Sequence, residues 1–173
     1  MPQKADTLDL SRFVPAPGDG RRVDVDVEPG RFIYGGQPYE PEGGKVPARL
    51  DLSRTTTGYA LRLRFDAPLE GPCVRCLEPA AQVVSVDARE VAARDATEEE
   101  LQSPYVTDDE LDLAAWAHDA LALAMPEKFV CRDDCAGLCG VCGESLNDAE
   151  PGAHEHESAP DPRWDKLREL QSE

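Results

Sequence analysis

Cysteine is the residue whose spacing predicts chemistry in this chain. All six cysteines fall in two short segments, Cys73–Cys76 and Cys131–Cys142. The first segment has the form Cys-x-x-Cys, and the second reads Cys-x3-Cys-x3-Cys-x-x-Cys. Thiolates bind zinc at about 2.3 Å, and structural zinc sites are usually closed tetrahedra built from such turns. Gly140 and Gly143 supply the flexible backbone that a metal-binding turn needs. The sequence therefore predicts a zinc site in the second half of the chain.

Two groupings of the cysteines can form a four-sulfur site. The local grouping uses the cysteines of the second segment and closes a short loop, so its assembly loses the least chain entropy. The mixed grouping joins the first segment to one of the later pairs, across a span longer than that of ordinary zinc ribbons. We favour the local grouping and leave the mixed one open. The candidate zinc ligands are Cys131, Cys135, Cys139, Cys142, Cys73 and Cys76.

A second metal ion would need ligands from outside the cysteine segments. His154 and His156 are available, but they fall in a stretch with the composition of a disordered linker. We expect these two histidines to lie on a solvated tail.

Redox and enzymatic chemistry are the alternatives for the cysteines. Arg75 lies between Cys73 and Cys76 and could lower a thiol pKa, as a catalytic dithiol requires. Strand patterns flank this pair on both sides, however, whereas a thioredoxin-like motif needs a βαβ setting. None of the three histidines has a catalytic setting, and no phosphate-binding glycine loop is present. We expect no enzyme and no small-molecule substrate.

The charge of the chain favours some partners over others. The 173 residues carry a net charge of −17, which argues against generic binding to nucleic acid and suits docking on a basic protein. The first residues have no apolar stretch of signal-peptide length, and no segment is long and apolar enough to span a membrane. We expect a cytoplasmic protein, and a reducing cytoplasm favours metal-bound over disulfide-bonded cysteines.

One segment is locally basic. Residues 45–64 hold five basic residues and one acid, whereas residues 87–112 hold ten acids and two arginines. Arg49, Arg62 and Arg64 share one face of a predicted hairpin, because side chains alternate along a strand. With Arg75, they are the candidates for binding RNA or another partner.

The remaining pattern predicts an α+β fold that is mostly antiparallel β. Alternating valines at 23, 25 and 27 predict a strand, and residues 49–65 predict a hairpin with an apolar face. A further strand follows Cys76. Leucine, alanine and tryptophan at helical spacing, with Asp112 as N-cap and Pro126 as a stop, predict one main helix over about 112–125. We expect a small sheet or partly open barrel with a C-terminal zinc knuckle.

The domain organisation follows from these patterns. We expect an N-terminal segment, a β-rich domain that includes the helix and a zinc segment, a disordered linker and a short C-terminal helix. Their bounds are 1–20, 21–147 (with the zinc segment at 131–147), 148–160 and 161–173.

Several motifs together resemble a known family. The run CVRCLEP from Cys73, the helix ending in Met125-Pro126, and the block CRDDCAGLCGVCGESLN from Cys131 are similar to the YceD-like family. The sequence Asp161-Pro162-Arg163-Trp164 looks like that family's tail motif. The resemblance covers most of the chain from about Leu50 to Asn147. These proteins are called large ribosomal RNA subunit accumulation proteins.

The resemblance implies a non-enzymatic ribosome-biogenesis factor that supports large-subunit ribosomal RNA. Two mechanisms follow for a zinc-stabilised adaptor: the arginine face docks on ribosomal RNA, or acidic surfaces bind a basic large-subunit ribosomal protein. The alternatives are a Cys-x-x-Cys redox protein and a zinc-stabilised interaction module unrelated to ribosomes.

Overall fold

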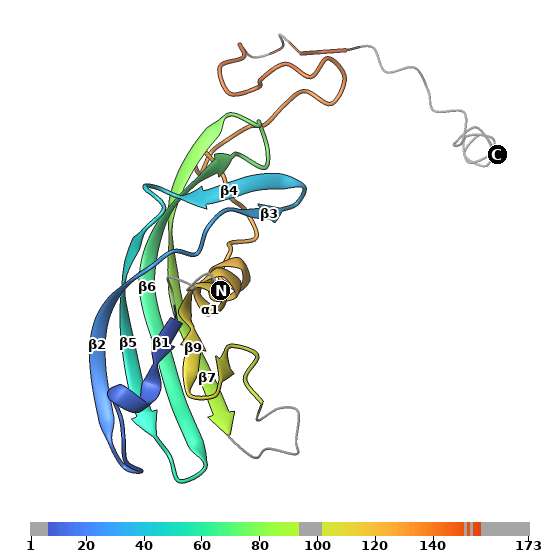
Figure 1. Ribbon diagram of the computed structural model, residues 1–173. Helices are drawn as coiled ribbons and strands as arrows, with labels where there is room; N and C mark the ends of the chain where they lie inside the picture. The colour runs from blue at the N-terminus through green and yellow to red at the C-terminus, as the bar shows by residue number, and fades with distance from the viewer. Residues whose placement is uncertain (1–6, 94–101, 151, 153, 157–173) are drawn as a thin grey trace, which may run out of the picture.

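Antiparallel strands make up most of the protein. The computed structural model describes residues 7–93, 102–150, 152 and 154–156. The six strands of the main sheet are β2 (Gly20–Val27), β3 (Phe32–Tyr34), β4 (Gln37–Pro41), β5 (Val46–Arg54), β6 (Gly58–Pro72) and β7 (Pro79–Ala93). The predicted class, mostly antiparallel β with one main helix, is confirmed, and the main sheet is open and strongly curved (Figure 1).

The hairpin of β6 and β7 is the longest element of this sheet. The two strands pair over 15 residues each, from Gly58 opposite Ala93 to Pro72 opposite Pro79. The other edge of β6 is shared, since β5 pairs with its first half and β4 pairs near its end. The predicted hairpin and its apolar face are therefore present, but β6 continues well past Phe65, where the predicted hairpin ended.

The helix α1 (Leu113–Leu123) lies on the concave side of the sheet (Figure 1). Its N-cap Asp112 accepts the Ala115 N–H at 3.0 Å, which satisfies one free donor of the first turn. The helix was expected over about 112–125, so the prediction is right to within two residues. Its buried residues, which include Trp116 and Leu121, share one hydrophobic core with inward side chains of the strands. These strand residues include Leu50, Leu52, Leu61 and Leu63.

A small sheet completes the inner side of the fold. Its strands are β1 (Thr7–Asp9), β9 (Glu110–Asp112) and β8 (Val106–Thr107), and the short helix η1 (Leu10–Arg12) follows β1. Leu10 and Val14 are buried in the main core. The N-terminal segment is thus anchored to the fold by the pairing of β1 with β9 and by the buried Leu10 and Val14.

Two predicted regions lie mainly or entirely outside the described residues. Only 148–150, 152 and 154–156 of the expected linker 148–160 are described, and nothing of the expected helix 161–173 is. Within the part that is described, no helix has the length and apolar character needed to cross a membrane.

Candidate metal centre

The turn between β6 and β7 carries the first Cys-x-x-Cys pair. The Cys73 N–H donates to the Glu78 carbonyl at 2.8 Å, and the Leu77 N–H donates to the Cys73 carbonyl at 3.0 Å. Leu77 has a φ of 63°, a left-handed conformation that is uncommon for a residue with a side chain. The Arg75 N–H points at the Cys73 sulfur, 3.4 Å away. We call residues 73–78 the first knuckle; strands flank it on both sides, as expected.

Four sulfur atoms from distant parts of the chain meet at this turn. Cys73 Sγ lies 3.8 Å from Cys135 Sγ, and Cys76 Sγ lies 3.6 Å from Cys131 Sγ. A regular tetrahedron with metal–sulfur bonds of about 2.3 Å has edges of about 3.8 Å. All four sulfurs lie within 4.8 Å of one another. This set, the proximal cluster, has the donor type, number and spacing of a structural zinc site.

Packing after α1 brings the two later cysteines of the proximal cluster to the knuckle. Phe129 is fully buried, and its ring stands edge-on to Tyr39 with centroids 4.9 Å apart. The Phe129 carbonyl accepts the Val74 N–H at 2.9 Å. Gln82 of β7 donates its side-chain amide to the Val130 carbonyl at 2.8 Å. These contacts fix the C-terminal segment against the sheet just before its first cysteine.

The cluster also favours the thiolate form at one sulfur. Burial raises the pKa of the Cys73 thiol, but hydrogen bonds from backbone N–H groups, those of Cys76 and Arg75 foremost, outweigh it and lower the pKa to about 6. Burial and the neighbouring sulfurs, Cys76 foremost, raise the pKa of Cys131 to about 12. Since the thiolate is the metal ligand, Cys73 is prepared to bind at neutral pH.

The last two cysteines belong to a second group. Cys139, Cys142, His154 and His156 each offer one ligand atom, and these four atoms also lie within 4.8 Å of one another. Cys139 is buried and Cys142 is exposed. We call this group the distal cluster. It lies in the segment that extends beyond the end of the β6–β7 hairpin (Figure 1).

The structure does not bring together the local grouping that the spacing favoured. It divides those cysteines, with Cys131 and Cys135 in the proximal cluster and Cys139 and Cys142 in the distal one. The mixed grouping is the one that fits this geometry. The buried Phe129 holds the start of the segment against the sheet, and this packing outweighs the advantage of closing a short loop.

The histidines also differ from expectation. His154, expected on a solvated tail, has its Nδ1 3.4 Å from Cys142 Sγ, and its side chain is only 16% exposed. Asn147 is a further residue that the spacing did not single out. Its side-chain oxygen accepts the Ala136 N–H at 2.8 Å, which ties together the two ends of the segment 136–147 that carries Cys139 and Cys142. The sequence did carry a signal for this group. The pair His154 and His156 follows closely behind the pair Cys139 and Cys142, and the two pairs together supply the four ligands of a zinc site.

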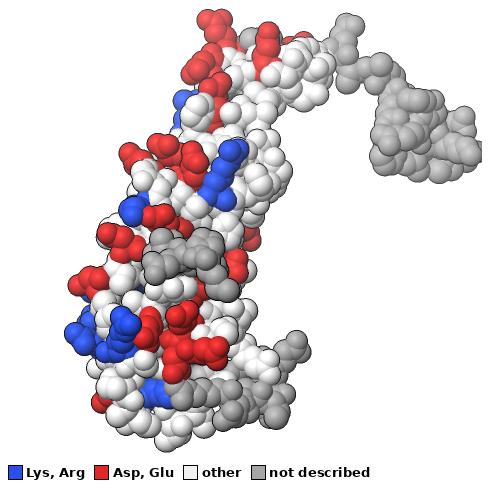
Figure 2. All heavy atoms as spheres, in the orientation of Figure 1, with Lys and Arg blue, Asp and Glu red and all other residues white. Residues whose placement is uncertain are grey.

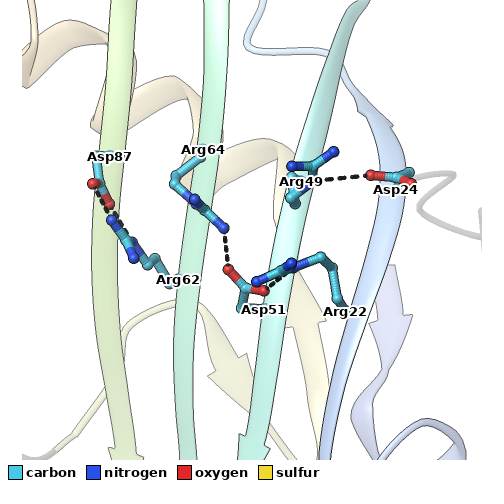
Figure 3. A network of polar contacts seen from close by, with 7 residues as sticks. All are labelled: Arg22, Asp24, Arg49, Asp51, Arg62, Arg64 and Asp87. Carbon is cyan, nitrogen blue, oxygen red and sulfur yellow. Dashed lines mark hydrogen bonds and ion pairs between the residues drawn. The ribbon is translucent and has the colours of Figure 1, made fainter.

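The predicted arginine face is present on the sheet, opposite α1, but its cations are paired (Figure 3). Arg62 binds Asp87 through two contacts of 2.5 and 2.7 Å. Arg64 binds Asp51 at 2.5 Å. The remaining pairs are Arg22 with Asp51 at 2.6 Å and Arg49 with Asp24 at 3.4 Å. Strand register places Arg22 and Arg62 opposite Asp51, Arg49 opposite Asp24, and Arg64 opposite Asp87. We call this network of charges across β2, β5, β6 and β7 the ladder.

The ladder lowers the pKa values of its aspartates. The hydrogen bond from Arg62 holds the pKa of Asp87 below its usual value, and the hydrogen bond from Arg22 does the same for Asp51. Both carboxylates therefore stay ionised at neutral pH and keep neutralising the arginines. Arg75 is not part of this face, since it lies in the first knuckle with its guanidinium 3.5 Å from the Ala136 carbonyl.

Acidic side chains gather at the end of the molecule that carries the clusters (Figure 2). Residues 131–150 hold one arginine and five acids, Asp133, Asp134, Glu144, Asp148 and Glu150. All five are exposed. We call these five residues the acidic end.

Most of the chain matches one family model. Residues 61–171 match the model described as "Large ribosomal RNA subunit accumulation protein YceD". The chain belongs to the YceD family. The match confirms the resemblance seen in the sequence. It begins within β6 and so includes the first knuckle, both clusters, Arg62 and Arg64, whereas Arg49 lies before its start.

Mycobacterial relatives are similar over most of this chain. Proteins described as uncharacterized from Mycobacterium tuberculosis and Mycobacterium bovis are 38% identical over 134 residues, which is 75% of this chain and 63% of each relative. One from Mycobacterium leprae is 38% identical over 132 residues, 72% of this chain and 59% of its own length. The chain thus spans less than two thirds of these YceD relatives, and no solved structure matches it.

Proposed function

We propose that this protein supports the accumulation of large-subunit ribosomal RNA as a non-enzymatic, zinc-stabilised adaptor in the cytoplasm. Its direct partner is a basic protein of the large ribosomal subunit rather than the RNA. The family match supports the link to the ribosome. The choice of partner rests on the pairing of the arginine face.

That pairing weakens the best candidate for binding phosphate. A protein gains affinity for nucleic acid when its lysines and arginines displace counterions from phosphates. Here Arg49, Arg62 and Arg64 already have carboxylate partners on the same face. Phosphates would have to displace these aspartates and would meet their repulsion, in a chain with a net charge of −17.

The acidic end offers the complementary surface for a basic protein. Its carboxylates are exposed and come from the same segment, 131–150, as four of the cysteines of the two clusters. Zinc bound at the proximal cluster would cross-link the β6–β7 hairpin to the C-terminal segment, and the four cysteines would hold it as thiolates. A rigid surface loses less conformational entropy when it binds, which favours recognition of one partner.

The test compares two sets of charge changes that are equal in size. The first set, Asp133→Asn, Asp148→Asn and Glu150→Gln, removes three charges from the acidic end. The control set, Glu40→Gln, Glu42→Gln and Glu70→Gln, also removes three exposed charges. Glu40 lies in β4, Glu42 follows that strand directly, and Glu70 lies in β6. We expect the first set to weaken binding to purified basic large-subunit ribosomal proteins by about tenfold or more, because complementary charges steer association. The control set should leave binding within about twofold.

The RNA mechanism is tested in the same assay. Replacing Arg62 and Arg64 with glutamate should leave ribosomal-protein binding unchanged. If those substitutions instead abolish binding to large-subunit ribosomal RNA, and if wild-type affinity falls steeply with salt, the RNA mechanism is correct and ours is wrong. Zinc content, measured on every variant, ensures that lost binding does not reflect a lost ion.

A further inference from the structure

The backbone of the first knuckle occurs a second time in the distal cluster. The Cys139 N–H donates to the Glu144 carbonyl at 2.8 Å, and the Gly143 N–H donates to the Cys139 carbonyl at 2.9 Å. Gly143 has a φ of 76°, in the same left-handed region as Leu77 of the first knuckle. We call residues 139–144 the second knuckle. Both turns read Cys-x-x-Cys-x-Glu, and both make the same two hydrogen bonds at the same offsets.

Burial of the leading cysteine is also shared. Cys73 in the first knuckle and Cys139 in the second are both buried. The second knuckle thus has the same backbone frame and the same placement of its first sulfur as the first.

Two histidines complete a four-ligand set at this turn. His154 Nδ1 lies 3.4 Å from Cys142 Sγ. A tetrahedral zinc with bonds of about 2.3 Å to sulfur and about 2.0 Å to nitrogen has sulfur–nitrogen edges of about 3.5 Å. The ligand atom of His156 lies within 4.8 Å of those of Cys139, Cys142 and His154. The spacing of the pairs therefore suits one zinc ion, just as it does in the proximal cluster.

We propose that Cys139, Cys142, His154 and His156 bind a second zinc ion, independent of the ion in the proximal cluster. The two sites share no ligand. The second site closes a short loop, 139–156, which remains attached to the rest of the protein through the segment after Cys135. Loading of one site therefore does not require loading of the other.

The two sites should differ in how readily they release zinc. In the proximal cluster Cys73, Cys76 and Cys135 are buried, whereas Cys142 and His156 of the distal cluster are exposed. A chelator can approach the exposed ligands directly, and loss of the distal ion leaves the hydrophobic core intact. We expect the distal ion to leave first, with little loss of folded structure.

The decisive measurement is the zinc content of the full-length protein purified under reducing conditions. We expect wild type to hold about two ions per chain, one for each cluster. The double variant His154→Ala/His156→Ala should hold one, and its thermal unfolding should stay close to wild type. The matched control Glu155→Ala changes the residue between the histidines and should keep both ions.

Two results would overturn the proposal. One is a wild-type content of a single ion that the double variant retains in full. The other is a double variant that still holds both ions. The conservative variant His154→Cys/His156→Cys keeps a zinc-binding side chain at both positions, so it should again hold two ions.

Cobalt spectroscopy identifies the donors without relying on stoichiometry. Cobalt bound to wild type should show a mixture of tetrahedral sites with four and with two thiolates. The double variant should lose only the contribution with two thiolates and keep the stronger sulfur-to-cobalt absorption of the proximal cluster. An unchanged spectrum would assign no cobalt to the histidines and refute the second site. Neither experiment depends on the ribosomal partner, so a second site that fails here leaves the proposed function standing.

Discussion

The two knuckles share one backbone design but differ in their surroundings. The first lies at the tip of the β6–β7 hairpin, and its sulfurs join those of Cys131 and Cys135 against the packed Phe129 ring. The second lies in the segment that extends beyond the end of this hairpin, and its additional ligands are histidines from the same segment. The local sequence thus sets the turn, whereas burial and packing decide whether a bound ion stabilises the whole fold or only a loop.

The two knuckles also differ in the residue that occupies the left-handed backbone position. The second knuckle has Gly143, which adopts this conformation without strain. The first has Leu77, whose side chain is 57% exposed and so gains little from burial. The surrounding sheet and the proximal cluster hold Leu77 in a backbone conformation that is unfavourable for a residue with a side chain. The first knuckle therefore tolerates strain that the second, with less support, avoids.

Removal of one sulfur from each cluster gives the largest expected contrast. Cys76→Ser breaks the proximal site and leaves the hairpin and the C-terminal segment unlinked. Structural zinc contributes a binding free energy on the order of 10 kcal/mol to folding, so this variant should lose its zinc and unfold at a much lower temperature. Calorimetry and zinc content check both effects.

Cys142→Ser is the matched change in the distal cluster. It should remove one ion but shift the unfolding temperature only slightly, because no core residue depends on that site. Equal losses of stability in the two serine variants would contradict the contrast between the clusters.

A core substitution tests whether packing positions the proximal ligands. Phe129→Ala removes a fully buried ring and should lower the free energy of unfolding by about 3–5 kcal/mol. It should also weaken proximal zinc binding in a competition titration, since Cys131 and Cys135 lose their support. Val141→Ala, in the exposed second knuckle, should change neither quantity. A Phe129 variant that lost stability but kept full zinc affinity would show that packing does not position the ligands.

Substitutions at the two left-handed positions should have opposite effects, one favourable and one unfavourable. Leu77→Gly relieves backbone strain of about 1–2 kcal/mol, partly offset by the greater entropy of glycine in the unfolded chain. We expect a small gain in stability at the first knuckle. Gly143→Ala should weaken distal zinc binding instead, because alanine is strained at a φ of 76°. Denaturant unfolding and zinc titration measure the two outcomes, and a loss of stability in Leu77→Gly would refute the assignment of strain.

The smallest effect should come from the arginine face, which lies outside both clusters. Asp87→Asn should leave zinc content unchanged and alter the unfolding temperature only slightly, since exposed ion pairs contribute little. The folded-state pKa of Asp87 is lowered, so its pairing stabilises the protein above the unfolded pKa near 3.8 and is lost as the pH falls through the folded value. The difference in stability between variant and wild type should therefore vanish in acid. A difference that persists at low pH would mean that the aspartate acts through packing rather than charge.

Sequence alone predicts the parts of this protein that depend on local pattern. Alternation at Val23, Val25 and Val27 predicts a strand, and the Asp112 cap predicts where the helix begins; both agree with the structure. The Cys-x-x-Cys spacing also predicts metal-binding turns, because their hydrogen bonds span only a few residues.

Features that depend on contacts between residues far apart in the sequence could be identified only from the structure. The loop-closure argument favoured the nearest four sulfurs, but the burial of Phe129 pairs Cys131 and Cys135 with a turn more than fifty residues away. The arginine face was predicted correctly in its orientation. Its partners Asp51 and Asp87 were visible in the sequence, but only strand register places them within contact of the cations.

The wide separation of the proximal sulfurs has a consequence for protein synthesis. The pairs that meet are 55 and 62 positions apart, and the last sulfur belongs to Cys135. A nascent chain can therefore form the β6–β7 hairpin soon after that hairpin leaves the ribosome, yet it cannot complete this site until Cys135 has also emerged. Capture of the ion would then follow hairpin formation, and products terminated before Cys135 would lack the site.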